Sequence, residues 1–372
     1  MMNRVLTMGI VLVVSLCGNT VAWSQQQVAP IRYFTEPTLP QDVYLIHPIP
    51  IDTGETAAPK DTLFQLMSLE GKPVSYYRSV VTEVCFDNSC RLLRVNLYWN
   101  VTGRYLGFEL PPHEFLSKAE HEPFTLDEYL RLHDILTDSL SPIGSFTYEE
   151  LVPMRPVIGV LDGITGATSQ NVLQYVVKGA VFTTYTIWNL IYGDTQREVV
   201  KATEQALDAN YLLAILNSAS VWDRHWALNR LSLLSDTPGV LKDRVLDLVC
   251  SESYNLAAHA IEAVPQAWCA ESAFQQALWA EFDCVQYALK PALLRKIGAC
   301  DHPDDTVLLD IARHLPPMNG PVLTAGLESL RKYLPENQAL LLRVAALLDH
   351  ENRFVANQVK KFLDEVTADN LE

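Results

Sequence analysis

The chain has 372 residues, of which 49% are hydrophobic and 19% charged, and its formal net charge is -16. A chain of this length buries a sizeable core and divides into about two domains. Its acidity argues against nucleic acid and anionic membrane surfaces as partners, because both repel negative charge.

The first 24 residues have the pattern of a secretory signal peptide. Arg4 gives a short basic start, residues 5–17 are nearly all apolar, and Ala22 and Ser24 place small residues where a signal peptidase cleaves. The apolar run is shorter than the roughly 20 residues of a membrane-spanning helix. No later segment is apolar and long enough to span a bilayer. We therefore expect an exported protein, periplasmic or extracellular, without a transmembrane segment in the mature chain.

Six of the seven cysteines follow the signal peptide. An even number of cysteines in an oxidising compartment favours disulfides over metal sites. Cys85 and Cys90 flank a turn-like stretch between two strand-like runs, so we expect a disulfide that closes a hairpin. The alternative is a redox-active dithiol, although its spacing exceeds the usual two residues.

The first half of the mature chain is expected to form an α+β domain preceded by an arm. Residues 25–60 contain six prolines and predict an extended arm without regular structure. The domain itself is expected to span residues 61–195. Its strands are predicted from β-branched and aromatic runs bounded by turn residues, at residues 79–85, 91–99, 105–110 and 157–161.

One helix of this domain has a clear start signal. Thr125 and Glu128 form a capping box, in which each side chain bonds the backbone N–H of the other residue. The amphipathic pattern that follows predicts a helix through about Leu136.

Residues 196–372 predict helices only, in a repeating pattern. The second helices of successive pairs are expected at intervals of roughly 31 to 36 residues. Their predicted starts lie near Val221, Ser253, Val285, Pro321 and Asn352. Residues 352–363 resemble the second helix of a HEAT repeat, and we expect a HEAT-like array in which stacking buries the apolar face of each pair. Pro291 predicts a kink inside the third pair.

One loop carries a candidate chemical motif. The predicted strand at residues 157–161 ends at Asp162, and a loop containing Gly166 and Ala167 follows. Thr168 and Ser169 are good N-cap residues, so a helix is expected to begin there. Free backbone N–H groups at such a helix start favour a bound phosphate.

This loop resembles the attachment motif of the FMN-binding domain family, which includes the C subunit of the sodium-pumping NADH:quinone oxidoreductase. The family pattern is Asp, two variable residues, Ser or Thr, Gly, Ala and Thr. Asp162, Thr165, Gly166, Ala167 and Thr168 fill it without a mismatch. The resemblance implies that a flavin transferase joins FMN to Thr168 through a phosphodiester. It extends more faintly over residues 62–194.

Other candidate sites have ordinary structural explanations. Four residues at helical spacing could form an aromatic wall for a flavin ring, but such a stripe is more often core: Phe182, Tyr185, Trp188 and Tyr192. The histidines His113, His121 and His133 are too irregularly spaced for a metal site. The sequence from Asn100 to Thr102 is an N-glycosylation sequon, which matters only in a eukaryotic host.

The expected function is that of an extracytoplasmic flavoprotein, in which FMN on Thr168 relays electrons and the helical array docks a redox partner. No nicotinamide site, second redox site or substrate base is evident, so electron transfer is favoured over a self-sufficient enzyme. The alternative is a non-catalytic exported adaptor that acts through its helical repeats.

The four cysteines of the array are expected to link neighbouring repeats. Cys250 and Cys284 lie at equivalent turns one repeat apart, and so do Cys269 and Cys300. Pairing in sequence order would instead join opposite ends of a helix roughly 18 Å long, whereas a disulfide spans only about 4.4 to 6.8 Å between Cα atoms. We therefore predict the disulfides Cys250–Cys284 and Cys269–Cys300.

Overall fold

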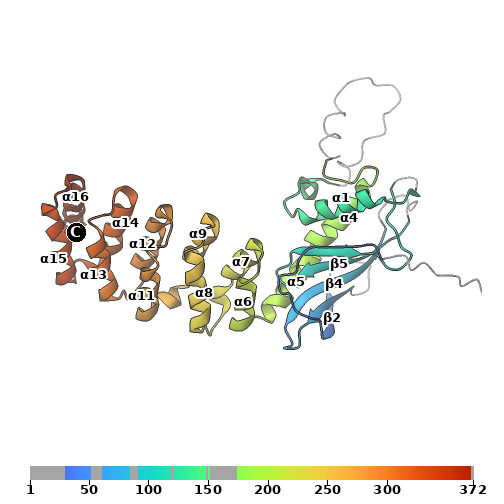
Figure 1. The fold of residues 1–372 in the computed structure, drawn as a ribbon, viewed down its shortest axis with the longest axis horizontal. Coiled ribbons are helices and arrows are strands. Elements are labelled where there is room, and N and C mark those ends of the chain that lie inside the picture. The colour runs from blue at the N-terminus through green and yellow to red at the C-terminus, as the bar shows by residue number, and fades with distance from the viewer. Residues whose placement is uncertain are drawn as a thin grey trace, which may run out of the picture.

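The computed structural model describes residues 30–51, 61–83, 91–118, 121–147, 150 and 174–369. A sheet with its covering helices forms one end of the molecule, and a row of helices extends from it to the C-terminal end (Figure 1). The chain thus has an α+β part followed by an all-α part. The predicted signal peptide, the Cys85–Cys90 hairpin, the strand at residues 157–161 and the motif at residues 161–169 lie outside the described residues.

Six strands form one antiparallel sheet in the spatial order β1-β6-β5-β4-β3-β2. The expected strands at residues 91–99 and 105–110 correspond to β5 and β6, whereas the expected strand at residues 79–85 overlaps only the end of β4, which begins six residues earlier. The turn between β5 and β6 contains Gly103 at φ +83°, a conformation that glycine adopts without strain. The strands are β1 (Arg32–Phe34), β2 (Leu45–Ile51), β3 (Asp61–Met67), β4 (Pro73–Thr82), β5 (Leu93–Asn100) and β6 (Tyr105–Glu109).

The proline-rich stretch corrects one expectation. Residues 25–60 are not an arm without regular structure, because they supply β1 and β2. Pro48 and Pro50 lie in β2, which is the edge strand next to β3. In an edge strand every second backbone N–H points away from the neighbouring strand and makes no hydrogen bond to it. Prolines two residues apart can therefore occupy these positions without loss of hydrogen bonds between the strands. Proline content alone could not reveal this pairing.

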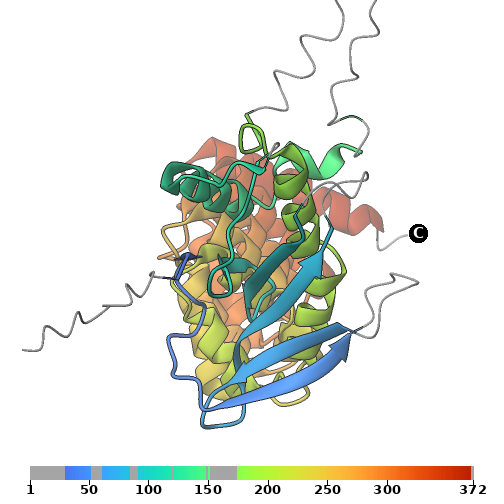
Figure 2. The ribbon, with the colours of Figure 1, turned by 90° about the vertical axis from the view of Figure 1, so that its right-hand side faces the viewer.

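One face of the sheet is buried and the other is more open. Along β4 the side chains of Tyr76 and Val80 are buried, whereas Ser79 and Val81 are exposed. This alternation follows from the two-residue period of a strand, which points successive side chains to opposite faces. Figure 2 shows the sheet in front of the helical array, viewed from the sheet end of the molecule.

In the part of the chain that the structure describes, four helical segments accompany the sheet: α1 (Leu126–Thr137), the short 3-10 helix η2 (Pro142–Ser145), α4 (Val181–Tyr192) and α5 (Asp194–Gln205). The capping box of Thr125 is present at the start of α1, as predicted. Trp99 of β5 donates its Nε1–H to the carbonyl of Ile191 in α4 at 3.0 Å. The hydroxyls of Tyr76 and Thr203 lie 2.9 Å apart, so α5 also packs on the buried face.

The all-α part consists of stacked helix pairs, five of them within residues 209–369. The first helices form one row: α6 (Ala209–Leu216), α8 (Gly239–Val249), α11 (Ser272–Ala280), α13 (Asp305–His314) and α15 (Gln338–Ala345). The second helices form the other row: α7 (Val221–Leu228), α9 (Tyr254–Ala263), α12 (Lys290–Gly298), α14 (Gly320–Leu330) and α16 (Arg353–Asp369). Neighbouring helices within each row contact one another (Figure 1).

Short helical segments connect these elements: η3 (Leu231–Leu233), α10 (Gln266–Cys269), η4 (Tyr287–Leu289), η5 (Arg331–Tyr333) and η6 (Ala346–Asp349). None of the helices in the described ranges is long and apolar enough to cross a bilayer.

The predicted positions of the second helices agree closely with the structure. Four of them begin within one residue of the predicted start, and the third pair begins with η4 at Tyr287 before α12. The predicted kink at Pro291 is wrong. Pro291 lies in the first turn of α12, where backbone N–H groups make no hydrogen bond within the helix, so a residue without an N–H costs nothing there. The fixed φ of proline also suits a helix.

The array also requires close backbone approach between α12 and α14. A Cβ atom added to Gly298 would lie 2.7 Å from Cα of Ser329. No side chain larger than hydrogen fits at this crossing without displacing one helix.

Candidate functional site

The described residues before and after the predicted flavin motif pack against the helices that accompany the sheet. On one side, Ile143 of η2 is fully buried, and on the other side Val176 and Val177 are buried just before α4. Val177 donates its N–H to Oγ1 of Thr184 at 3.2 Å, and the Arg131 guanidinium of α1 binds the carbonyl of Gln174. Asp162 and the residues from Thr165 to Ser169 lie between these residues in the sequence, outside the described residues.

Three of the four aromatic residues of the α4 stripe pack against the core, where Trp188 is buried and Tyr185 and Tyr192 are half-buried. Trp188 donates Nε1–H to the carbonyl of Asp138 at 3.1 Å, and Gly144 faces its ring so closely that a Cβ would lie 2.3 Å away. The hydroxyl of Tyr185 donates to the carbonyl of Phe146 at 3.2 Å.

Tyr192 makes a similar contact, since its hydroxyl donates to the carbonyl of Leu136 at 2.6 Å. Burial raises the pKa of Tyr192 well above its usual value, so it stays a neutral donor. These rings therefore hold α1 and η2 against α4.

The histidines His113, His121 and His133 do not form a common site in the described structure. His133 of α1 lies in an aromatic cluster, with Nδ1 3.0 Å from the Tyr105 hydroxyl, and burial lowers its pKa. His113 and His121 are exposed loop residues with positive φ.

A buried polar network joins the sheet to the first helix pair. Asp223 of α7 is completely buried and accepts hydrogen bonds from Ser218 at 2.9 Å, Thr102 at 2.7 Å and Asn100 at 2.8 Å. The guanidinium of Arg104 forms an ion pair with it at 3.1 Å. Burial alone would raise the pKa of Asp223, but Arg104 and the hydroxyl donors outweigh it and the pKa falls below its usual value.

This network also corrects the interpretation of the sequon. Asn100 is completely buried, and its amide nitrogen binds Asp223 and the hydroxyl of Thr38. The amide nitrogen that would accept a glycan is therefore occupied in the folded protein. Sequence reasoning did not find the network, because Asp223 lies in the first turn of α7, where an acidic residue is expected on electrostatic grounds alone.

The cysteines of the array connect consecutive helix pairs. Cys250, at the end of α8, is disulfide-bonded to Cys284, which follows α11, with a Cα–Cα distance of 5.6 Å. This is the pairing predicted from the helix register. The Glu281 carboxylate lies 3.0 Å from the Cys250 sulfur, and these three side chains place donor atoms within 4.8 Å of one another. The disulfide occupies both sulfurs, which leaves no thiolate for a metal ion.

The second predicted disulfide is absent from this structure. Cys269 and Cys300 are free, buried thiols that interact with each other across the junction of the third and fourth pairs. The register therefore places these cysteines together as expected, but the bond itself is not formed. The hydrogen bond from Cys300 lowers the pKa of Cys269 to about 7.

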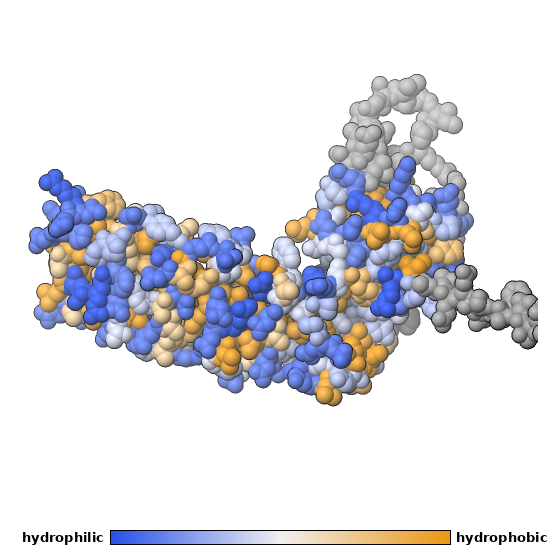
Figure 3. Space-filling model, in the orientation of Figure 1, coloured by the Kyte–Doolittle hydropathy of each residue, from blue (hydrophilic) through white to orange (hydrophobic). Residues whose placement is uncertain are grey.

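Aromatic side chains at the starts of the second helices form a repeated surface feature, which we call the aromatic row. It consists of Trp222, Tyr254, Tyr287 and Phe354, which are 72%, 49%, 58% and 44% exposed. Exposed Pro321 occupies the corresponding position in the fourth pair. Elsewhere on the array, hydrophobic and hydrophilic residues are interspersed on the face shown in Figure 3.

Comparison with known proteins adds no relative. No family model matches this chain, and no curated protein or solved structure is significantly similar to it.

Proposed function

We propose that this protein is an exported flavoprotein that carries FMN on Thr168 through a phosphodiester and relays electrons to a redox partner. The observation that carries the proposal is the uninterrupted sequence match from Asp162 to Thr168. The α+β layout of residues 30–205 supports it, because an α+β fold is what the resemblance implies. FMN would supply the electron-transfer chemistry, since the chain offers no other redox cofactor motif.

The proposed roles of the chain's own residues follow from their chemistry. Thr168 provides the hydroxyl that is esterified, and the small residues Gly166 and Ala167 let the transferase approach the backbone. Asp162 is a recognition residue for the transferase. Trp188 of α4 does not fit as a stacking surface, because its ring is buried and its Nε1–H bonds the Asp138 carbonyl.

Intact-mass analysis tests this proposal directly. The full chain, expressed with a flavin transferase in an exporting host, should gain the mass of one FMN less one water. Thr168→Ala should remove the added mass, whereas Ser169→Ala should retain it, since only Thr168 fills the acceptor position. An unmodified chain, in cells where a known substrate of the transferase is modified, contradicts the proposal.

The second candidate function is an exported adaptor, with a HEAT-like array as its docking surface. The aromatic row favours it, because stacked repeats offer an extended binding surface and Trp and Tyr are enriched among the residues that contribute most to binding at interfaces. A photoreactive amino acid at Trp222 or Tyr254 should then crosslink one discrete partner in the source organism. The same probe at Gln276, an exposed position on the first-helix row, serves as the control. Equal crosslinking at all three positions contradicts the adaptor function.

A further inference from the structure

The fifth helix pair exposes apolar positions that the fourth pair buries. Leu308 and Leu315 belong to α13 and its C-terminal end, and they are 1% and 0% exposed. The residues 33 positions later, Leu341 and Leu348, are 40% and 41% exposed. The fourth pair is covered by the fifth, since α13 contacts α15. Leu341 and Leu348 therefore form an uncovered apolar surface on the fifth pair, equivalent to the surface of the fourth pair that the fifth pair covers. We call this surface the end face.

The end face contains a groove between η6 and α16. It is lined by apolar residues and rimmed by polar ones: Leu348, Ala356, Asn357, Lys360, Leu363 and Asp364. Stacked helix arrays need a polar outer surface at their ends, because an uncovered inter-pair surface leaves apolar area in water. Because Leu348 lines it, the groove is part of the end face.

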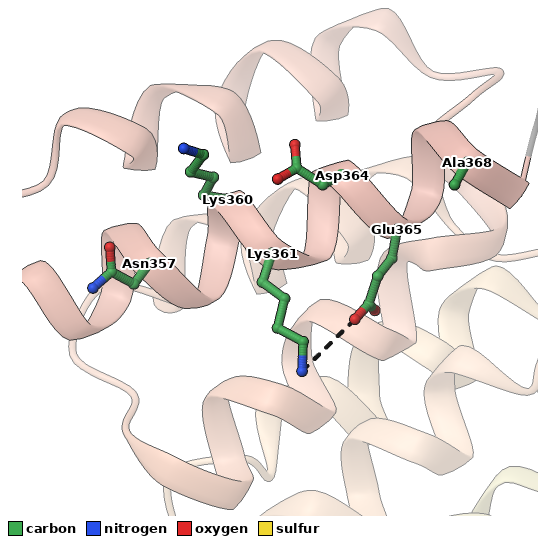
Figure 4. A pocket seen from close by; sticks show the side chains of 6 residues that line it. All are labelled: Asn357, Lys360, Lys361, Asp364, Glu365 and Ala368. Atoms are coloured by element: carbon green, nitrogen blue, oxygen red, sulfur yellow. Dashed lines mark ion pairs between the residues drawn. The ribbon is translucent and has the colours of Figure 1, made fainter.

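The charges along α16 separate into two sets (Figure 4). Lys361 pairs with Glu365 at 3.8 Å, and Glu365 also pairs with Arg331 at 2.9 Å. Lys360 and Asp364 lie one turn apart and point away from that set. Neither forms an ion pair with another residue of the described ranges.

We propose that the end face binds the end face of a second copy of this chain. A two-fold axis crossing α16 between Lys360 and Asp364 would set the two helices antiparallel. Each Lys360 would then face Asp364 of the other copy, so the charged rim is complementary to itself. Such an isologous contact forms a closed dimer, because the same patch is used on both partners. Leu341 and Leu348 would be covered in the same contact.

Charge-swap variants of the full chain provide the test, with mass measured by light scattering after size exclusion. The wild type should be a dimer. Lys360→Asp and Asp364→Lys should each dissociate at least about tenfold more readily, because like charges would face each other in both halves of the contact. An equimolar mixture of the two variants should form a heterodimer, since Asp at position 360 would then face Lys at position 364.

Two further measurements keep the result interpretable. Lys361→Asp, at a side chain that points toward Glu365 and away from Lys360 and Asp364, should remain dimeric, and the circular dichroism of every variant should match that of the wild type. Leu348→Asp should also give monomers, because it places a charge in the apolar groove. A monomeric wild type at about 100 μM, well above the micromolar dissociation constants of ordinary specific interfaces, overturns the proposal. A dimer that both charge variants leave intact overturns it as well.

Discussion

The sheet domain and the helical array differ in the contacts that stabilise each of them. The difference lies in how far apart along the sequence the contacting residues are. In the sheet, consecutive strands pair from β2 to β6, but β1 pairs with the distant β6, so Arg32 lies opposite Glu109. In the array, cross-links join residues about one helix pair apart, as in the disulfide Cys250–Cys284 with a separation of 34 residues. Regular separations leave a periodic pattern in the sequence, whereas the pairing of distant strands leaves none. The array was therefore the more predictable half.

The two parts meet through packing and through the network around Asp223. Tyr211 of α6 donates its hydroxyl to the carbonyl of Pro73 in β4, and Lys72 pairs with Asp208 at 2.6 Å. Asp223 adds a buried charge that four groups from both parts satisfy. We call these contacts between the sheet domain and the first helix pair the joint. Their strength determines whether the array unfolds together with the sheet domain or as an independent unit.

Removing the charge at the joint should have the largest effect. Asp223→Ala leaves the buried Asn100 amide without one acceptor and Arg104 without its partner, so we expect a loss of about 3 to 5 kcal/mol in unfolding free energy. Thermal denaturation should also separate into two transitions, one for each part. Asp243→Ala, at an exposed position on α8, is the matched control. A single transition at the wild-type temperature would mean that the joint contributes nothing to the coupling.

Loss of the disulfide should weaken the array without affecting the sheet. The double variant Cys250→Ser/Cys284→Ser opens a loop of 34 residues and should cost about 2 to 4 kcal/mol, chiefly through the greater freedom of the unfolded chain. Hydrogen exchange should increase in α8 through α12 and stay unchanged in β4 and β5. Non-reducing peptide mapping checks the premise, and a free Cys250 thiol in the wild type would contradict it.

A smaller effect is expected where two helices of the second-helix row cross. Gly298→Ala places a methyl group against Ser329, which overpacks the crossing of α12 and α14 and should cost about 1 to 3 kcal/mol. Urea unfolding measures the change. Gly239→Ala is the control, because a Cβ at Gly239 meets nothing within 4 Å. Equal stability of the two variants would show that the helices separate freely at this crossing.

The smallest expected effect concerns a histidine pair between α7 and α9. The Nδ1 atoms of His225 and His259 lie 2.6 Å apart, and burial, followed by the charge of His259, lowers the pKa of His225. Below pH 6.5 the unfolded chain binds the proton more readily than the folded chain, so stability should fall as the pH drops. Urea unfolding at pH 7.5 and 5.5 should show a loss below about 1 kcal/mol. His225→Gln should reduce it and His302→Gln should not, so identical losses in both variants would contradict the assignment.

Local patterns determined much of this protein. The capping box of Thr125 specified the start of α1, and the repeat spacing located the second helices from Val221 to Arg353. The same register identified the neighbouring turns of Cys250 and Cys284. Each of these features depends on residues within about one helix pair, so its signal survives in the order of the residues.

Only the tertiary structure decided the features that depend on distant partners. It placed Pro48 and Pro50 in an edge strand, where prolines are tolerated. It also buried Trp188 of α4, whose Nε1–H bonds the Asp138 carbonyl. It buried Asn100, the first residue of the sequon, against Asp223, 123 residues away. It also left Leu348 exposed while Leu315 is buried. In each case the surroundings of a side chain are set by segments that no local pattern identifies.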